Sequence, residues 1–278
     1  MKDLKIDSGK VSRNLVGFIK QEARKRGFSR AIIGLSGGVD SATIAFLAAK
    51  ALGPKNVWGV TIPHRSNSKE SIRHAGLIIK KLGINALNVD ITAQIDAYFS
   101  NESLWDRKFP GVSPDVPRDS FGGSLRERIR AGNKMARERM SVLYDLSAKY
   151  RALVIGSSNR TELLLGYGTI HGDLACAIMP LGCLYKTQVW QLAEYLGVPG
   201  EIIKKPPTAD LWHGQTDEGE LGFRYKDADR LLFNMVDRKK TPVQLKVMGF
   251  NRDFIKNVRD RIKRNAFKRQ LPPVPPAC

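Results

Sequence analysis

A run of hydroxyl, glycine and carboxylate residues, SGGVDS at residues 36–41, stands between two apolar segments. Residues 31–35, AIIGL, predict a strand, and the alanine-rich residues 40–52 predict a helix. A glycine turn from a strand into a helix leaves backbone N–H groups free at the positive end of the helix dipole. Because glycine lets a phosphate approach the backbone closely, this unit predicts an anion-binding site.

Asp40 is the residue of this run that a phosphate site alone does not need. Its carboxylate would repel a phosphate unless a cation lies between them, and Mg²⁺ is a cation that shares oxygen ligands with phosphates. The alternative is that Asp40 only complements the helix dipole and that the serines cap the helix. The run lacks the lysine of GxxxxGK[ST] and does not match GxGxxG. The complete strand–turn–helix unit favours a nucleotide site with pyrophosphate and magnesium.

Strands and helices alternate along the chain, which predicts an α/β fold with a doubly wound, Rossmann-like parallel sheet flanked by helices. The expected strands are residues 31–35, 56–63, 84–91 and 152–156, and the expected helices are 11–26, 40–52, 69–82, 125–150 and 186–196. Residues 1–278 are expected to form a single domain. Proline and glycine predict mobile loops at about 100–123 and 204–225, and a basic tail with terminal prolines occupies 265–278.

The 278-residue chain has a formal net charge of +19, which predicts a field that attracts polyanions. The alternative is a basic surface that is only solvated. Three cysteines without ligand spacing indicate no disulfide framework and a reducing compartment. The polar N-terminus does not fit a signal peptide, and no apolar run reaches the length of a bilayer. We therefore expect a cytoplasmic protein without a membrane segment.

Several strings in the second half of the chain narrow the function. They are NKMARERMSVLYD, IGSSNRTELLLGYGTIHGD, YKTQVWQLAEYLGVP, KKPPTADLWHGQTDEGELGFRY and FKRQLPP. SGGVDS resembles the SGGxDS signature of the ATP pyrophosphatases, and with these strings the chain resembles the ammonia-dependent NAD synthetases from about Leu15 to Pro273. The archaeal members look closest. The resemblance implies the adenine nucleotide alpha hydrolase-like form of the fold and a homodimer, with the helix at 125–150 as the expected contact.

The resemblance implies that ATP adenylylates the carboxylate of deamido-NAD and that ammonia then displaces AMP to give NAD. Such chemistry depends on positioning and charge neutralisation, which agrees with the lack of a Ser-His-Asp or Cys-His set in this sequence. One alternative is an ATP pyrophosphatase that acts on another carboxylate or on tRNA, for which the positive charge is suited. No RNA-binding module is recognisable, so nucleic acid is not expected. A second alternative, a non-catalytic nucleotide-binding protein, is disfavoured because both expected magnesium ligands are present.

The resemblance also assigns residues to ligands, with none as an acid or base. For ATP they are Gly34, Leu35, Ser36, Gly37, Gly38, Val39, Asp40, Ser41, Ser157, Lys186 and Thr208; for magnesium, Asp40 and Glu162; for deamido-NAD, Arg137, Asp173 and Lys268. Each has a structural alternative: Lys186 could flank a helix, Arg137 could lie on a solvated helix face, and Glu162 could be a first-turn residue. Residues 214–222, GQTDEGELG, are expected to form part of a lid.

Three positions depart from the family pattern on the deamido-NAD side. Ile170 replaces a lysine, Ala177 replaces an aspartate and Phe267 replaces a histidine. Loss of a charge-assisted hydrogen bond typically costs about 1.5–3 kcal/mol. Either neighbours such as His171 and Asp173 take over recognition, or the acyl substrate differs, and the sequence leaves both open.

Overall fold

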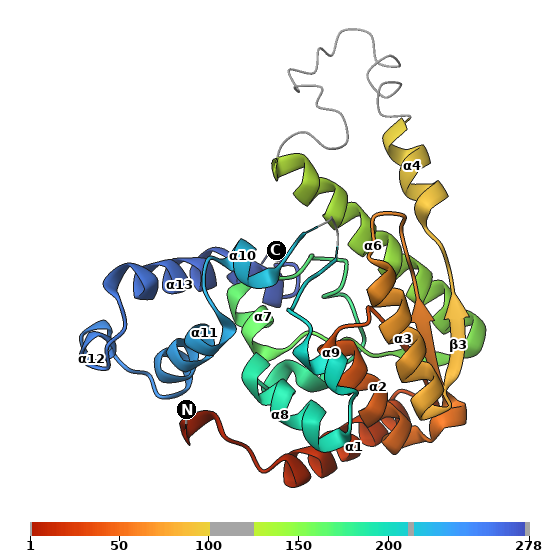
Figure 1. The fold of residues 1–278 in the computed structure, drawn as a ribbon, viewed down its shortest axis with the longest axis horizontal. Helices are drawn as coiled ribbons and strands as arrows, with labels where there is room; N and C mark the ends of the chain where they lie inside the picture. Colours follow the sequence, from red (N-terminus) through yellow and green to blue (C-terminus); the bar gives the residue numbers. More distant parts are fainter. Residues whose placement is uncertain (1, 101–124, 211–213, 276–278) are drawn as a thin grey trace, which may run out of the picture.

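The computed structural model describes residues 2–100, 125–210 and 214–275 of the chain. The centre is a sheet of four parallel strands in the order β3-β2-β1-β4 (Figure 1). The strands are β1 Arg30–Gly34, β2 Val57–Thr61, β3 Asn85–Asn88 and β4 Ala152–Val154. The prediction of a parallel sheet flanked by helices is confirmed. The predicted loop at 100–123 lies, after residue 100, outside the described residues.

Both faces of the sheet are buried under helices. Successive side chains of a strand point to opposite sides, so each strand contributes to an apolar cluster on either face. In β1, Ala31 and Ile33 belong to one apolar cluster, whereas Ile32 belongs to another. The first cluster joins the sheet to helices α1 Ser8–Lys25, α2 Val39–Leu52, α3 Lys69–Leu82 and α8 Lys186–Leu196. The second joins it to α4 Thr92–Ser100 and α6 Leu125–Tyr150 on the opposite face.

A third apolar cluster lies beside α8 and contains the last helices of the chain. These and the shorter helices before them are α7 Arg160–Leu165, α9 Gly200–Lys204, α10 Asp217–Leu221, α11 Tyr225–Leu232, α12 Pro242–Val247 and α13 Arg252–Arg264. Single turns of 3-10 or π-helix lie at Lys2–Leu4, Pro54–Asn56, Pro180–Cys183, Phe233–Asp237 and Ala266–Arg269. None of the described helices has both the length and the apolar character that a bilayer crossing requires.

Candidate active site

A cavity of about 950 Å³ opens at the carboxyl ends of β1 and β4. Its wall includes the turn after β1, the segment after β4, the first residue of α8 and residues 205–210. β1 has β2 on one side and β4 on the other, so the order of the strands reverses at β1. Ligands of open parallel sheets bind at such a switch point, where the loops of neighbouring strands separate.

The glycine turn is held in shape by its own hydroxyl groups. Gly37 has a φ of +75°, and a Cβ at this position would lie 2.2 Å from the backbone oxygen of Ser71 in α3, so a larger residue does not fit. The Ser41 hydroxyl donates to the carbonyl of Gly38 over 3.0 Å, and the Ser36 hydroxyl lies 3.1 Å from that of Ser41. Because Gly37 has no side chain, the turn packs directly against α3, and the N-terminus of α2 faces the cavity.

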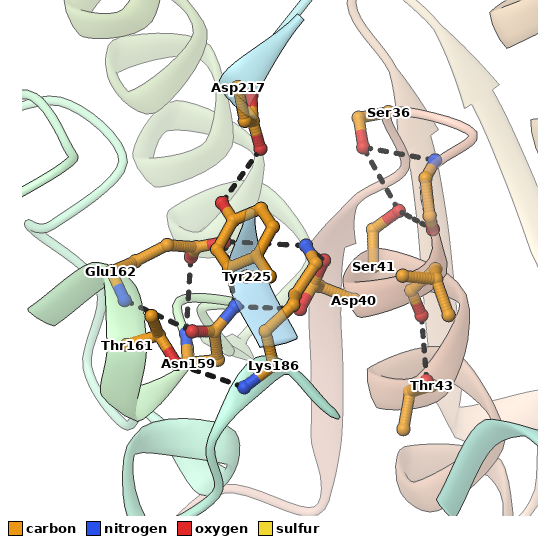
Figure 2. A network of polar contacts seen from close by, with 12 residues as sticks. Ser36, Asp40, Ser41, Thr43, Asn159, Thr161, Glu162, Lys186, Asp217 and Tyr225 are labelled. Carbon is orange, nitrogen blue, oxygen red and sulfur yellow. Dashed lines mark hydrogen bonds and ion pairs between the residues drawn. The ribbon is translucent and has the colours of Figure 1, made fainter. Parts of the chain in front are cut away.

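The carboxylates of Asp40 and Glu162 come from different segments and share two donors, the amide of Asn159 and the ammonium of Lys186. The side-chain amide of Asn159 donates to Asp40 Oδ1 over 3.0 Å and to Glu162 Oε1 over 2.7 Å. The ammonium of Lys186 pairs with Asp40 Oδ2, and its Nζ lies 3.5 Å from Glu162 Oε1. Figure 2 shows these four side chains converging from α2, α7 and α8. The Lys186 side chain is only 3% exposed, so this is a buried charge cluster.

The cluster holds more carboxyl groups than ammonium groups. Burial alone would lower the pKa of Lys186, but Asp40, Glu162 and Asp217 outweigh it, and the pKa lies above its ordinary value. Burial raises the pKa of Glu162; Lys186 opposes this and Asp40 adds to it. One ammonium thus faces several carboxylates, which favours a further cation when phosphates bind beside them.

The donor set suits a magnesium ion that is shared with phosphates. Asp40 and Glu162 offer hard oxygen ligands, line the same cavity as the glycine turn and already share one cationic partner. Among the described residues, no group of three or more His, Cys, Asp or Glu side chains could hold a metal ion. Phosphate and water would therefore complete the coordination, which is the usual arrangement for Mg²⁺.

Glu162 and Lys186 also have the structural roles that the alternatives predicted. Asn159 is the N-cap of α7 and accepts from the backbone N–H of Glu162, and the Glu162 carboxylate accepts from the backbone N–H of Asn159. Lys186 is the first residue of α8. The capping box fixes the rotamer of Glu162, so the same contacts that begin the helix direct its carboxylate toward Asp40.

Asp229 of α11 joins the starts of α7 and α8. Its fully buried carboxylate accepts from the Thr161 hydroxyl over 2.6 Å and from the backbone N–H of Thr187 over 2.7 Å. The backbone N–H of Lys186 donates to the Thr161 hydroxyl over 3.0 Å. Since Thr161 precedes Glu162, Asp229 fixes the distance between the helix starts that carry Glu162 and Lys186.

The predicted lid segment contacts the cluster through α10. The Tyr225 hydroxyl donates to Asp217 Oδ2 over 2.9 Å, and the Tyr167 hydroxyl lies 3.0 Å from Asp217 Oδ1. The Lys186 ammonium lies 5.1 Å from the centre of the Tyr225 ring, which favours the charge at that point. Asp217 thus links α10 to the charge cluster (Figure 2). The mobility of the segment stays a prediction.

Most of the residues assigned to ATP lie at the cavity. Gly34, Leu35, Ser36, Gly38, Val39, Asp40, Ser157, Lys186 and Thr208 line it, as does the magnesium candidate Glu162. Gly37 and Ser41 do not line the cavity and shape the turn instead.

The residues assigned to deamido-NAD divide into two groups. Asp173 and Lys268 line the cavity. Arg137 does not: it is exposed on α6, and its Nε donates to the backbone oxygen of Ile170 over 3.2 Å. The ammonium of Lys268 donates to the backbone oxygens of Gly166 and Gly168, so it also holds the loop after α7.

The three departures from the family pattern lie off this cavity. Ile170, Ala177 and Phe267 are absent from its wall. Ala177 packs against the first apolar cluster, and Phe267 is 56% exposed. In this chain the three side chains therefore form no part of the cavity wall that the described residues make.

Sequence reasoning missed a second network, which fastens the segment that carries Thr208. The Asp210 carboxylate accepts from the backbone N–H of Ser68 over 3.0 Å, and the Asn67 amide donates to the Asp210 backbone oxygen. Arg139 of α6 donates from Nη2 to Asn67 Oδ1 over 3.0 Å. These contacts join three segments that are far apart in the sequence, so no local pattern could reveal them.

Comparison with known proteins gives concordant matches. Residues 11–272 match the family described as NAD synthase. An NH(3)-dependent NAD(+) synthetase of Trichlorobacter lovleyi is 47% identical over 98% of this chain and 92% of its own length. The solved structure of NMN synthetase from Francisella tularensis has a TM-score of 0.81 at 29% identity and covers 98% of this chain and all of its own.

A third relative is the solved NH3-dependent NAD synthetase from Campylobacter jejuni, in complex with nitrate. It has a TM-score of 0.76 at 31% identity and covers 97% of this chain and 99% of its own. These relatives are bacterial, so the expected closeness to archaeal members is not supported.

Proposed function

Because this chain belongs to the NAD synthase family and has NH3-dependent NAD(+) synthetase activity, we propose that its cavity performs the reaction through an acyl-adenylate. The observation that carries the proposal is the convergence of Asp40, Glu162 and Lys186 beside the glycine turn, in a cavity whose wall also includes Asp173 and Lys268. One cavity can therefore hold the phosphates of ATP close to a second substrate.

In the first step a carboxylate oxygen of deamido-NAD attacks the α-phosphorus of ATP, and the bond to the β-phosphate breaks to release pyrophosphate. The backbone N–H groups at the start of α2 and the Lys186 ammonium would hold the phosphates and balance their charge. Asp40 and Glu162 would hold Mg²⁺, which when bound supplies further neutralisation of the triphosphate.

In the second step ammonia attacks the acyl carbon, its nitrogen forms the amide bond, the bond between the acyl carbon and the AMP oxygen breaks, and one proton of the ammonia is released to solvent. Oxide is a far poorer leaving group than AMP, which is why the carboxylate is first adenylylated. The contribution of the protein is to hold both substrates in a fixed geometry and to exclude water from the acyl-adenylate.

The test of this proposal is a coupled assay with the wild-type chain, ATP, Mg²⁺, ammonium and deamido-NAD. We expect pyrophosphate and NAD to appear in equal amounts, because one adenylylation precedes each amide bond. Pyrophosphate without NAD, or NAD without pyrophosphate, would contradict the acyl-adenylate route. Omission of deamido-NAD is the control, and pyrophosphate release that other carboxylates or tRNA stimulate would favour the alternative substrates.

We also propose that the chain forms a homodimer through α6. The resemblance to the family implies a homodimer with this helix as the contact. Leu125 and Ile129, one turn apart on α6, are 66% and 47% exposed and lie at the cavity wall. Burial of this apolar pair would stabilise a pair of subunits. We expect analytical ultracentrifugation to give a species of twice the chain mass of 31.0 kDa. A monomer at micromolar concentration would contradict the proposal.

A further inference from the structure

Three basic residues near the end of the described chain face the cavity from one side. Arg261 and Arg264 lie one turn apart at the end of α13, and Lys268 lies in the turn of 3-10 helix that follows. All three line the cavity. Arg261 and Arg264 lie outside the strings that resemble the family, and neither has a role in the acyl-adenylate route described above.

The structure holds this segment firmly against α7. The Asn265 amide donates to the backbone oxygen of Leu165 over 3.0 Å, and Arg269 donates to the backbone oxygen of Leu163 over 2.8 Å. Lys268 contributes its two bonds to the loop after α7. Figure 1 shows the end of α13 beside α7 and α10. The two arginines therefore sit on a fixed part of the cavity wall.

The guanidinium groups of Arg261 and Arg264 have no hydrogen-bond or ion-pair partner among the described residues. Glu220, whose charge acts on Arg261, is already engaged: its carboxylate accepts from Tyr167 over 2.6 Å and from Gln215 over 3.0 Å. Burial lowers the pKa of Arg261, and Arg264 lowers it further. Adjacent cations without a counter-ion repel one another, and a bound anion would relieve that repulsion.

We propose that Arg261 and Arg264 form a phosphate-binding subsite for the pyrophosphate of deamido-NAD. The planar guanidinium group with several N–H donors matches phosphate oxygens better than any other side chain. The phosphates of ATP already have the glycine turn and Lys186 in the proposed function, on which this inference rests. The second substrate is the other phosphate-bearing molecule of the reaction, and its nicotinate end must reach the ATP side of the same cavity.

The test uses Arg261→Gln, Arg264→Gln and the double variant, because glutamine keeps the side chain polar and removes the charge. We expect the Kd for deamido-NAD, measured by calorimetry without ATP, to rise about tenfold for each variant and about 100-fold for both. The KM for ATP should change less than about twofold. Deamido-NMN has the same carboxylate but one phosphate and no adenosine, so its KM should rise less. Arg264→Lys should restore part of the affinity.

Arg259→Gln is the matched control, because Arg259 lies on the exposed face of the same helix and off the cavity, and the charge change is the same. An equal loss in this variant would reduce the effect to general electrostatics and overturn the subsite. A rise in the KM for ATP in place of deamido-NAD would assign the arginines to the other substrate and overturn it too. Failure of the wild type to amidate deamido-NAD would instead contradict the proposed function.

Discussion

Replacement of Asp40 by asparagine is expected to lower the kcat of adenylylation about 1,000-fold. Asparagine keeps the volume and the oxygen that accepts from Asn159, but it removes the charge that pairs with Lys186 and the ligand proposed for magnesium. Pyrophosphate release with saturating ATP and deamido-NAD measures the loss. We expect the fold to stay intact, because Lys186 keeps Glu162 as a charged partner, and circular dichroism with a thermal melt checks this.

The control for Asp40→Asn is Asp260→Asn, which makes the same chemical change in an exposed ion pair with Lys256 on α13. Exposed pairs of this kind contribute about 0–1 kcal/mol, so activity and melting temperature should match the wild type. Near-normal pyrophosphate release by Asp40→Asn, with an unchanged dependence on magnesium concentration, would show that Asp40 is not a magnesium ligand.

Replacement of Lys186 by methionine is expected to impair both activity and folding. Methionine has a similar length but no charge, so Asp40 and Glu162 lose the cation between them while they stay in a largely buried site. Removal of one partner from a buried charge cluster destabilises a protein by about 3–5 kcal/mol. Loss of a positive group at the phosphates should also lower kcat by about 100- to 1,000-fold. Denaturant titration and the pyrophosphate assay measure the two effects.

Magnesium makes the Lys186→Met experiment more specific. If Asp40 and Glu162 can hold the ion, Mg²⁺ should raise the melting temperature of this variant more than that of the wild type, because the ion replaces the missing charge. Lys256→Met is the control, since it removes a lysine from an exposed ion pair and should cost less than about 1 kcal/mol. Equal responses of the variant and the wild type to Mg²⁺ would contradict the proposed metal ligands.

The sequence predicted the arrangement of the sheet well because its signals are local. Strand-like runs of five to eight residues that alternate with helical patterns are enough to indicate parallel strands with crossovers. The ends of the elements were less accurate. The first helix begins at Ser8, three residues before the predicted start at Val11, because the Asp7 side chain caps it by accepting from the backbone N–H of Lys10 over 2.9 Å.

In the candidate site, too, residues in local motifs were predictable and residues held by distant contacts were not. The glycine turn, Glu162 and Lys186 lie in motifs that can be read in order, and the structure brings them together. The role of Asp229 could not be predicted from a local motif, because its partner Thr161 lies 68 residues away. A weak signal does exist: Tyr225 and Leu232, four positions before and three positions after Asp229, are buried on the same face of α11, and a carboxylate there needs donors.

Arg137 and Arg139 lie in one motif, but helix geometry directs them to different sides of α6. Residues two positions apart on a helix point about 200° apart, so only one of the pair can face a given cavity. Here Arg139 lines the cavity, and Arg137 is exposed on another face. The assignment of Arg137 to deamido-NAD stays a prediction, and Arg139 is a cavity residue that the motif did not single out.

The contacts of Asp229 with Thr161 and Thr187 affect the order in which the active site forms during folding. The residues of the glycine turn and of α3, against which it packs, lie within the first 82 positions, whereas the carboxylate that sets α7 against α8 arrives only with residue 229. Contacts of such long sequence separation form late, after the entropy of closing the intervening loops has been overcome. We therefore expect a chain whose last helices have not docked to lack the bridge that aligns Glu162 with Lys186, and to cleave ATP only after α11 is in place.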